Sequence, residues 1–192
     1  MTGKNCVGIA WYVIYGHSLL CLHVRHSLYI CSCYSDLRLG AQFMTVDKNF
    51  TKIFEMNDRL YVGLPGLATD VLTLKNLLTF RCNMYKLKEN RDISPEAFNG
   101  LVSTLLYEKR FGPYFCEPII AGLKDDNTPY LSGMDLIGAP VLPENFCVSG
   151  TCTPNMHGLC EAMFKPDMEK EELFEVLSQC LLSAVDRDAL SG

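Results

Sequence analysis

The chain has 192 residues, of which 48% are hydrophobic and 20% are charged, and its formal net charge is −5 at pH 7. This length and composition predict one globular domain with a sizeable core. Sequence-independent binding of nucleic acid needs clustered Lys and Arg, so an acidic chain without a basic run is a poor candidate for it.

Residues 11–35 differ in composition from the rest of the chain. They hold the only Trp and three of the four His, and they contain no Asp, Glu or Lys. The His residues and Arg25 interrupt the apolar run, so neither a membrane span nor a secretory signal is predicted. Two interpretations remain: a β-hairpin with Gly16 in its turn, or sequence that does not belong to the ordinary product.

Ten cysteines are a high number for this length, but no CxxC pair occurs, so the usual zinc spacing is missing. Cys31 and Cys33 lie near His23 and His26, yet their spacing is not that of a typical metal site, and we expect no metal or cofactor. Several others interrupt apolar runs, where a free thiol behaves as a small buried hydrophobe: Cys82, Cys116, Cys147 and Cys180. Without a clear signal peptide, a reducing cytosolic or nuclear setting is expected.

After residue 35, turn and capping residues at regular intervals predict the helices and strands in chain order. Residues 52–55 and 59–64 are expected to be strands joined by a tight turn at 56–58. A helix from about Leu67 to Asn90 follows. Its apolar positions recur at helical spacing: Leu67, Val71, Leu74, Leu78, Cys82 and Tyr85.

The next helix has a sharply marked start. Ser94 can cap it, Pro95 suits the first helical position, and Glu96 favours the positive end of the helix dipole. The helix should run to about Arg110 and be ended by the Gly-Pro pair at 112–113.

The second half of the chain repeats the order of strands followed by helices. Short apolar runs separated by turn residues predict strands at 114–123, 130–136 and 146–149. A short helix at 153–164 and a longer one capped by Asp167 should follow. Blocks of strands, two helices, strands and two helices predict an α+β fold, with a mostly antiparallel sheet pair covered by helices on both outer faces.

Residues 105–114 read LLYEKRFGPY, and six further segments are similarly distinctive: 3–7, 58–64, 66–71, 135–138, 148–152 and 184–189. All seven segments resemble proteasome β subunits, and among them the non-catalytic β3 type. The resemblance runs nearly continuously from Asp36 to Gly192. It implies the four-layer αββα sandwich of the N-terminal nucleophile hydrolases.

The resemblance also implies a role and partners. The chain would be a structural subunit, not an enzyme, that supports ring assembly for ubiquitin-dependent protein degradation in the cytoplasm and nucleus. Its partners would be neighbouring β subunits, α-ring subunits and the opposite β ring, with no nucleic acid and no membrane.

Active members of this family attack the peptide bond with an N-terminal threonine. The resemblance carries over remnants of their site, namely a lysine, its aspartate, an oxyanion-hole glycine and a serine and aspartate-serine group: Lys52, Asp36, Gly66, Ser149, Asp188 and Ser191. Beside an absent nucleophile, we interpret the lysine and aspartate as a buried ion pair. No catalytic residue is therefore expected.

Thr2 is the alternative nucleophile, because removal of Met1 would expose its amine. In that case the chain would be an active threonine endopeptidase. Catalysis requires geometry before a suitable pKa, and the strand residues that would carry Thr2 to Lys52 are absent. The non-catalytic interpretation is therefore favoured.

One domain, residues 1–192, is expected, and it departs from the family in two places. Residues 11–35 stand where the family has one short step, so we predict either an atypical insertion or a mis-spliced segment or gene-model error. Alternatively, residues 28–35 could replace the lost strand, because 30–34 has strand-forming composition. The family continues past Gly192 with two strands and a tail, so we expect weak stability alone and impaired incorporation.

Overall fold

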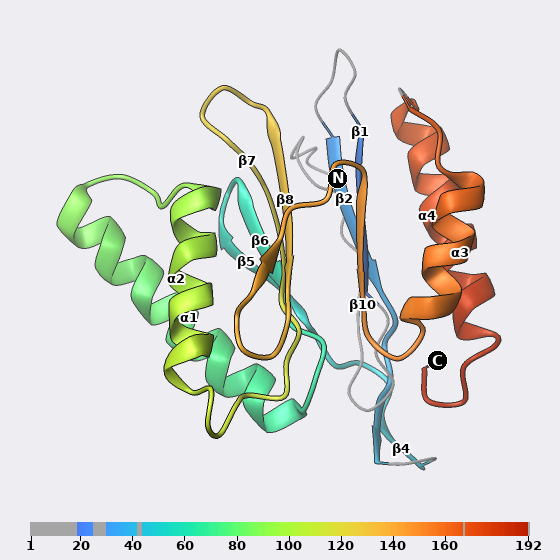
Figure 1. Cartoon of the computed structure of the whole chain (residues 1–192), viewed down its shortest axis with the longest axis horizontal. Coiled ribbons are helices and arrows are strands. Elements are labelled where there is room, and N and C mark those ends of the chain that lie inside the picture. Colours follow the sequence, from blue (N-terminus) through green and yellow to red (C-terminus); the bar gives the residue numbers. More distant parts are fainter. Residues whose placement is uncertain (1–18, 25–29, 42–43, 167, 192) are drawn as a thin grey trace.

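Four layers stack in the order helices, sheet, sheet, helices in the computed structural model, which describes residues 19–24, 30–41, 44–166 and 168–191 (Figure 1). The larger antiparallel sheet follows the order β5 (Ile53–Asn57), β6 (Leu60–Gly63), β7 (Ile119–Leu123), β8 (Pro129–Met134) and β9 (Pro140–Val141). The smaller one follows the order β10 (Phe146–Ser149), β1 (Leu19–Val24) and β2 (Ile30–Ser35). A separate ribbon pairs β3 (Leu39–Ala41) with β4 (Met44–Asp47).

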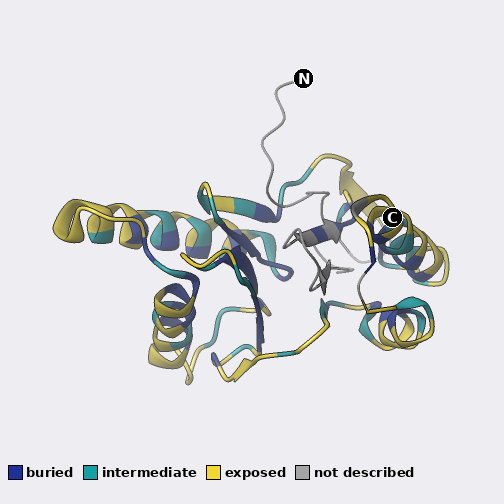
Figure 2. Cartoon of the chain, turned by 90° about the horizontal axis from the view of Figure 1, so that it is seen from above, coloured by how far each residue is buried: buried dark blue, intermediate teal, exposed yellow. Residues whose placement is uncertain are grey.

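Two helices cover the outer face of each sheet. The larger sheet packs against α1 (Ala68–Glu89) and α2 (Pro95–Glu108), and the smaller one against α3 (Thr153–Met163) and α4 (Lys170–Val185). Seen from above, the exposed residues lie on the outer sides of the helices and the buried ones along the sheets (Figure 2). The predicted αββα class is confirmed.

Three apolar clusters fill the three spaces between the layers. One lies between α1, α2 and the larger sheet and includes Leu74 and Phe98. The second lies between the sheets and joins Cys33 on β2 to Tyr61 on β6. The third packs α3 and α4 together against the smaller sheet, where Phe146 and other partly buried side chains contact it. Each layer therefore has an apolar neighbour, as a stacked fold requires.

Successive side chains of the central strands point to opposite faces of the larger sheet, so this one sheet contributes to two apolar clusters. In β7, Ile120 belongs to the cluster under the helices, whereas Ile119 and Ala121 belong to the cluster between the sheets. In β6, Leu60 and Tyr61 divide in the same way. Successive strand residues point to opposite faces, so a strand buried on both sides is apolar throughout.

The helix boundaries follow the capping residues. Ser94 accepts a hydrogen bond from the backbone N of Ala97 at 3.3 Å, and Pro95 opens α2, as predicted. Asn90 ends α1 in the left-handed conformation with φ of 53°, which asparagine tolerates better than most residues. Asp167 lies outside the described residues, and the prediction that it caps α4 is wrong, because the N-cap position is Glu169.

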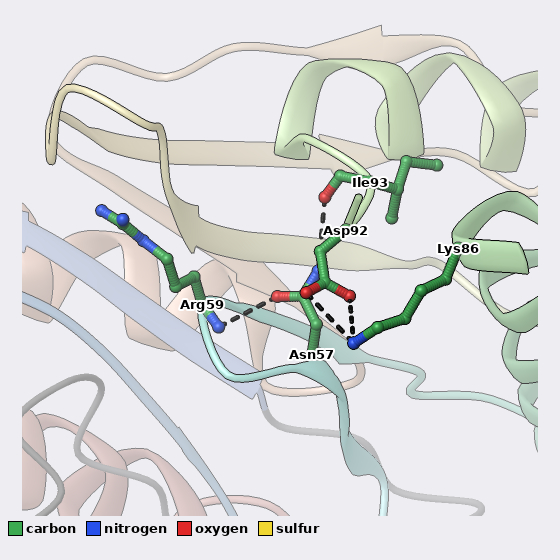
Figure 3. Close-up of polar contacts among 5 residues, drawn as sticks. All are labelled: Asn57, Arg59, Lys86, Asp92 and Ile93. Carbon is green, nitrogen blue, oxygen red and sulfur yellow. Dashed lines mark hydrogen bonds and ion pairs between the residues drawn. The ribbon is translucent and has the colours of Figure 1, made fainter. Parts of the chain in front are cut away.

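The turn between β5 and β6 is tied to the loop between α1 and α2 (Figure 3). The side chain of Asn57 accepts from the backbone N of Arg59 at 2.9 Å and donates to the carbonyl of Ile93 at 3.2 Å. Beside it, Lys86 and Asp92 form an ion pair at 2.9 Å. Both charged side chains are more than half exposed, so this pair contributes little. Asn57 therefore makes the firmer link between sheet and loop.

The front segment forms strands where the structure describes it. Within 11–35, β1 and β2 pair as antiparallel neighbours, and β2 confirms the strand predicted at 30–34. Gly16 and its predicted turn lie outside the described residues, as do His26 and Thr2. Among the described helices, none is long and apolar enough to cross a bilayer.

Candidate functional site

Lys52 is the most enclosed of the predicted site residues. It stands just before β5 and its side chain is 0% exposed. Its backbone carbonyl accepts from the N of Leu64 at 2.8 Å, which fixes it to the end of β6. Its Nζ lies 3.5 Å from the carbonyl of Arg38 and 5.7 Å from the ring centroid of Phe50. The amine is therefore held inside the protein.

Asp36 follows β2 directly and is buried as well. Burial lowers the pKa of Lys52 to about 6, although the charge of Asp36 acts to raise it. Burial thus disfavours the charged form of this amine, and the charge of Asp36 favours it. The interaction between the two groups agrees with their predicted nearness, and the buried ion pair itself stays a prediction.

Gly66 lies between β6 and α1 with φ of 150° and forms an antiparallel bridge with Cys116. The backbone N of Leu67 donates to Phe115 at 2.8 Å, and that of Glu117 donates to Pro65 at 3.1 Å. A Cβ on Gly66 would stand 1.9 Å from the carbonyl oxygen of Phe115. Because two backbone segments approach each other closely here, this position requires glycine. That requirement does not depend on the predicted role of Gly66 in an oxyanion hole.

Asp188 is the centre of a polar cluster just after α4. Its Oδ2 accepts from Thr151 at 2.6 Å, from Ser191 at 2.7 Å and from the thiol of Cys152 at 3.1 Å. Partial burial acts to raise the pKa of this carboxyl, but the hydrogen bonds outweigh it and lower the pKa to about 2. Such a weak base is poorly suited to take a proton at neutral pH.

Ser149 does not join this cluster through its hydroxyl. Its Oγ donates instead to Glu117, with 3.0 Å to Oε2 and 3.2 Å to the backbone carbonyl. Ser191, which was predicted together with Asp188, contacts it, whereas its other two partners, Thr151 and Cys152, were not predicted. Thr151 and Cys152 lie in the segment 148–152, which carries the family resemblance, so that resemblance could have identified them. No feature of the sequence identified Glu117.

A cavity of about 540 Å³ lies between the turn at Gly66 and the turn that follows β10. Its lining comes from four separate parts of the chain: Pro65, Gly66, Leu67, Phe115, Cys116, Glu117, Leu136, Gly150 and Thr151. Lys52 is not part of that lining. The structure thus places Gly66 and Thr151, a hydrogen-bond partner of Asp188, in the lining of one cavity.

Metal binding finds no support in the part of the chain that is described. No group of three or more His, Cys, Asp or Glu side chains there could hold an ion. The side chains of Cys31, His23 and His26 lie outside what the structure describes. Cys33 is buried and disulfide-bonded.

Comparison with known proteins supplies the family. The family model described as "Proteasome subunit" matches residues 24–192. The chain is 52% identical to proteasome subunit beta type-3-B of Arabidopsis thaliana over 192 residues, which is 100% of this chain and 82% of that protein. It is 49% identical to proteasome subunit beta type-3 of Dictyostelium discoideum and 43% identical to that of Drosophila melanogaster, with the same coverage of 100% and 82%.

Proposed function

The chain belongs to the proteasome subunit family, and from this premise we propose that it is a non-catalytic β subunit of the β3 type. Its relatives with the name beta type-3 are about half identical to it over its whole length. The four-layer αββα fold supports this proposal, because it is the fold that the family resemblance implies. Its contribution to protein degradation is therefore structural.

The enclosure of Lys52 is the observation that carries the non-catalytic assignment. An attacking threonine needs a nearby group to manage its proton, within hydrogen-bond reach. The Lys52 amine packs instead beside Phe50 and the Arg38 carbonyl, and it does not line the cavity that Gly66 and Thr151 share. The burial of this amine supports a structural role for Lys52 in place of a catalytic one.

The partners follow from the family. Members assemble with other proteasome subunits, and we propose that this chain contacts neighbouring β subunits, the α ring and the opposite β ring. A heterologous contact repeats around a ring until the ring closes, so one subunit without activity can still be needed for the whole. We propose the cytoplasm and nucleus as its location.

Incorporation into particles tests this role. We expect an affinity-tagged copy of the chain, expressed in cells that normally make it, to recover the other proteasome subunits. Subunits identified by mass spectrometry after native purification give the measurement. The impaired incorporation expected from the sequence would appear as a low yield of the chain relative to its neighbours.

The matched control carries Leu177→Asp, because Leu177 is 0% exposed in the third apolar cluster and a charge there disrupts the core. This variant should recover no ring subunits. If the unaltered chain also recovers none while remaining folded by circular dichroism, the structural role is wrong.

A further inference from the structure

Three exposed side chains gather at the end of α2 and in the turn that follows it. Phe111 is 92% exposed and Tyr107 is 55% exposed. The central guanidinium carbon of Arg110 lies 4.8 Å from the ring centroid of Tyr107 and 4.5 Å from that of Phe111. Both distances are within the range of a cation–π contact. Tyr107, Arg110 and Phe111 therefore form one cluster, which we call the arginine–aromatic patch.

Backbone hydrogen bonds and a buried neighbour fix the position of this patch. The backbone N of Arg110 donates to the carbonyl of Tyr107 at 3.2 Å, and that of Gly112 donates to the carbonyl of Lys109 at 2.9 Å. Leu106, directly before the patch, is 0% exposed in the cluster between α1, α2 and the larger sheet. A surface that is already ordered loses less conformational entropy when it binds. The patch is thus preorganised for a contact.

The residue types of the patch are those of an interface centre. Tyr, Phe and Arg are enriched in protein–protein interfaces relative to the rest of the surface. Tyr and Arg are also frequent among the few residues that supply most of the binding free energy. A phenylalanine that is 92% exposed contributes almost nothing to the core of its own chain. Its apolar area is available for burial against a partner.

Arg110 sets the chemistry of that partner. Within the part of the chain that the structure describes, no carboxylate forms an ion pair with Arg110. A guanidinium can contact aromatic rings and also bind a carboxylate through its planar fork of N–H donors. Docking would remove Arg110 from water, and a charge buried at an interface needs a partner of opposite sign. The complementary surface therefore carries a carboxylate.

We propose that the arginine–aromatic patch binds a neighbouring proteasome subunit, which presents an Asp or Glu to Arg110 and an apolar recess to Phe111. This inference rests on the proposed function, because it requires that the chain assembles with other subunits. It adds the surface and the chemistry of one contact.

Photo-crosslinking at position 111 identifies the neighbour. The photoreactive amino acid p-benzoylphenylalanine replaces Phe111 in the affinity-tagged chain, which keeps an aromatic ring there. Core particles recovered through the tag are irradiated, and linked peptides are identified by mass spectrometry. We expect a link to one other proteasome subunit, close to an Asp or Glu of that subunit. An unirradiated sample is the control.

Charge reversal tests Arg110 itself. In the crosslinking chain, Arg110→Glu opposes two carboxylates and should lower the linked fraction at least about tenfold. Arg81→Glu is the matched control, because Arg81 is also exposed but lies within α1. It should leave the linked fraction unchanged. Replacing the neighbour's acidic residue with arginine should restore the link to Arg110→Glu. Circular dichroism checks that each variant is folded.

The outcomes separate this inference from the proposed function. The patch is not the contact if the tagged chain recovers core particles but position 111 links to no other subunit, or links to a second copy of the chain. An unchanged linked fraction in Arg110→Glu also contradicts it. In these cases the proposed function still holds. If the unaltered chain recovers no proteasome subunit, both the function and the contact are wrong.

Discussion

Replacing Lys52 with methionine should remove a pH dependence of stability of up to about 1.4 kcal/mol per pH unit, because methionine carries no titrating group. The lysine side chain is 0% exposed and its pKa is lowered from 10.5 to about 6. Between those values the unfolded chain carries a proton on Lys52 that the folded chain has lost. Folding therefore carries a penalty, which methionine removes.

The sign of the pH dependence follows from the same pKa difference. The penalty is complete below about pH 6 and disappears as the pH rises through 10.5, so stability should rise with pH across this window. The slope contributed by Lys52 is at most about 1.4 kcal/mol per pH unit. In Lys52→Met this contribution should vanish. Urea unfolding at pH 7, 8, 9 and 10 measures it.

Lys48→Met is the matched control, because Lys48 is exposed. It should change neither the stability at pH 7 nor the slope. A loss of stability in Lys52→Met, with the pH slope unaltered, would instead indicate a charged lysine in an ion pair with Asp36. That outcome would support the ion pair predicted from the sequence.

Substitution of Gly66 by alanine should lower the free energy of unfolding by at least about 3 kcal/mol, because it combines backbone strain with a steric clash. The new Cβ would lie 1.9 Å from the carbonyl oxygen of Phe115 and 2.7 Å from the Cα of Cys116. Both are backbone atoms, so relief requires the 115–117 segment to move. That movement would break its bonds to Leu67 and Pro65.

Gly100→Ala provides the comparison for this effect. Gly100 lies within α2, and a Cβ there meets nothing within 4 Å. Alanine should stabilise that helix by about 0.5–1 kcal/mol, since glycine is entropically costly in a helix. Chemical denaturation of both variants gives the two values. Equal stability of Gly66→Ala and the unaltered chain would show that the bridge at Gly66 is not needed.

Elements with strong local signals were predicted well. Ser94 and Pro95 fixed the start of α2, and the apolar spacing of α1 identified Val71, Leu74, Leu78 and Cys82, which are all buried. Caps and helical periodicity are local properties, so a single sequence carries them.

Short strands were predicted less well. The predicted strand at 114–123 begins only at Ile119, because the residues before it cross over to pair with the Gly66 turn. The ribbon of β3 and β4 was not predicted, because β4 has only four residues, and an alternation over so short a run is a weak signal. All four residues of β4 are exposed. β9 has only two residues.

The chemistry of the site depended on what the fold brings together. Resemblance named Lys52 and Asp188, but the lowered pKa of Lys52 comes from burial, which no motif reports. The contact of Ser149 with Glu117 depends on how the end of β10 meets a loop 32 residues away in sequence. Such contacts between distant segments set pKa values and partners, and they become visible only in three dimensions.

The intact mass of this subunit after treatment with an electrophile tests the non-catalytic assignment most directly. Core particles recovered through the tagged chain would be incubated with a reagent that reacts with N-terminal threonine. The mass of every subunit would then be measured. We predict that catalytic subunits gain the reagent while this chain keeps its mass. An adduct on the peptide containing Thr2 would contradict the assignment and establish a threonine endopeptidase instead.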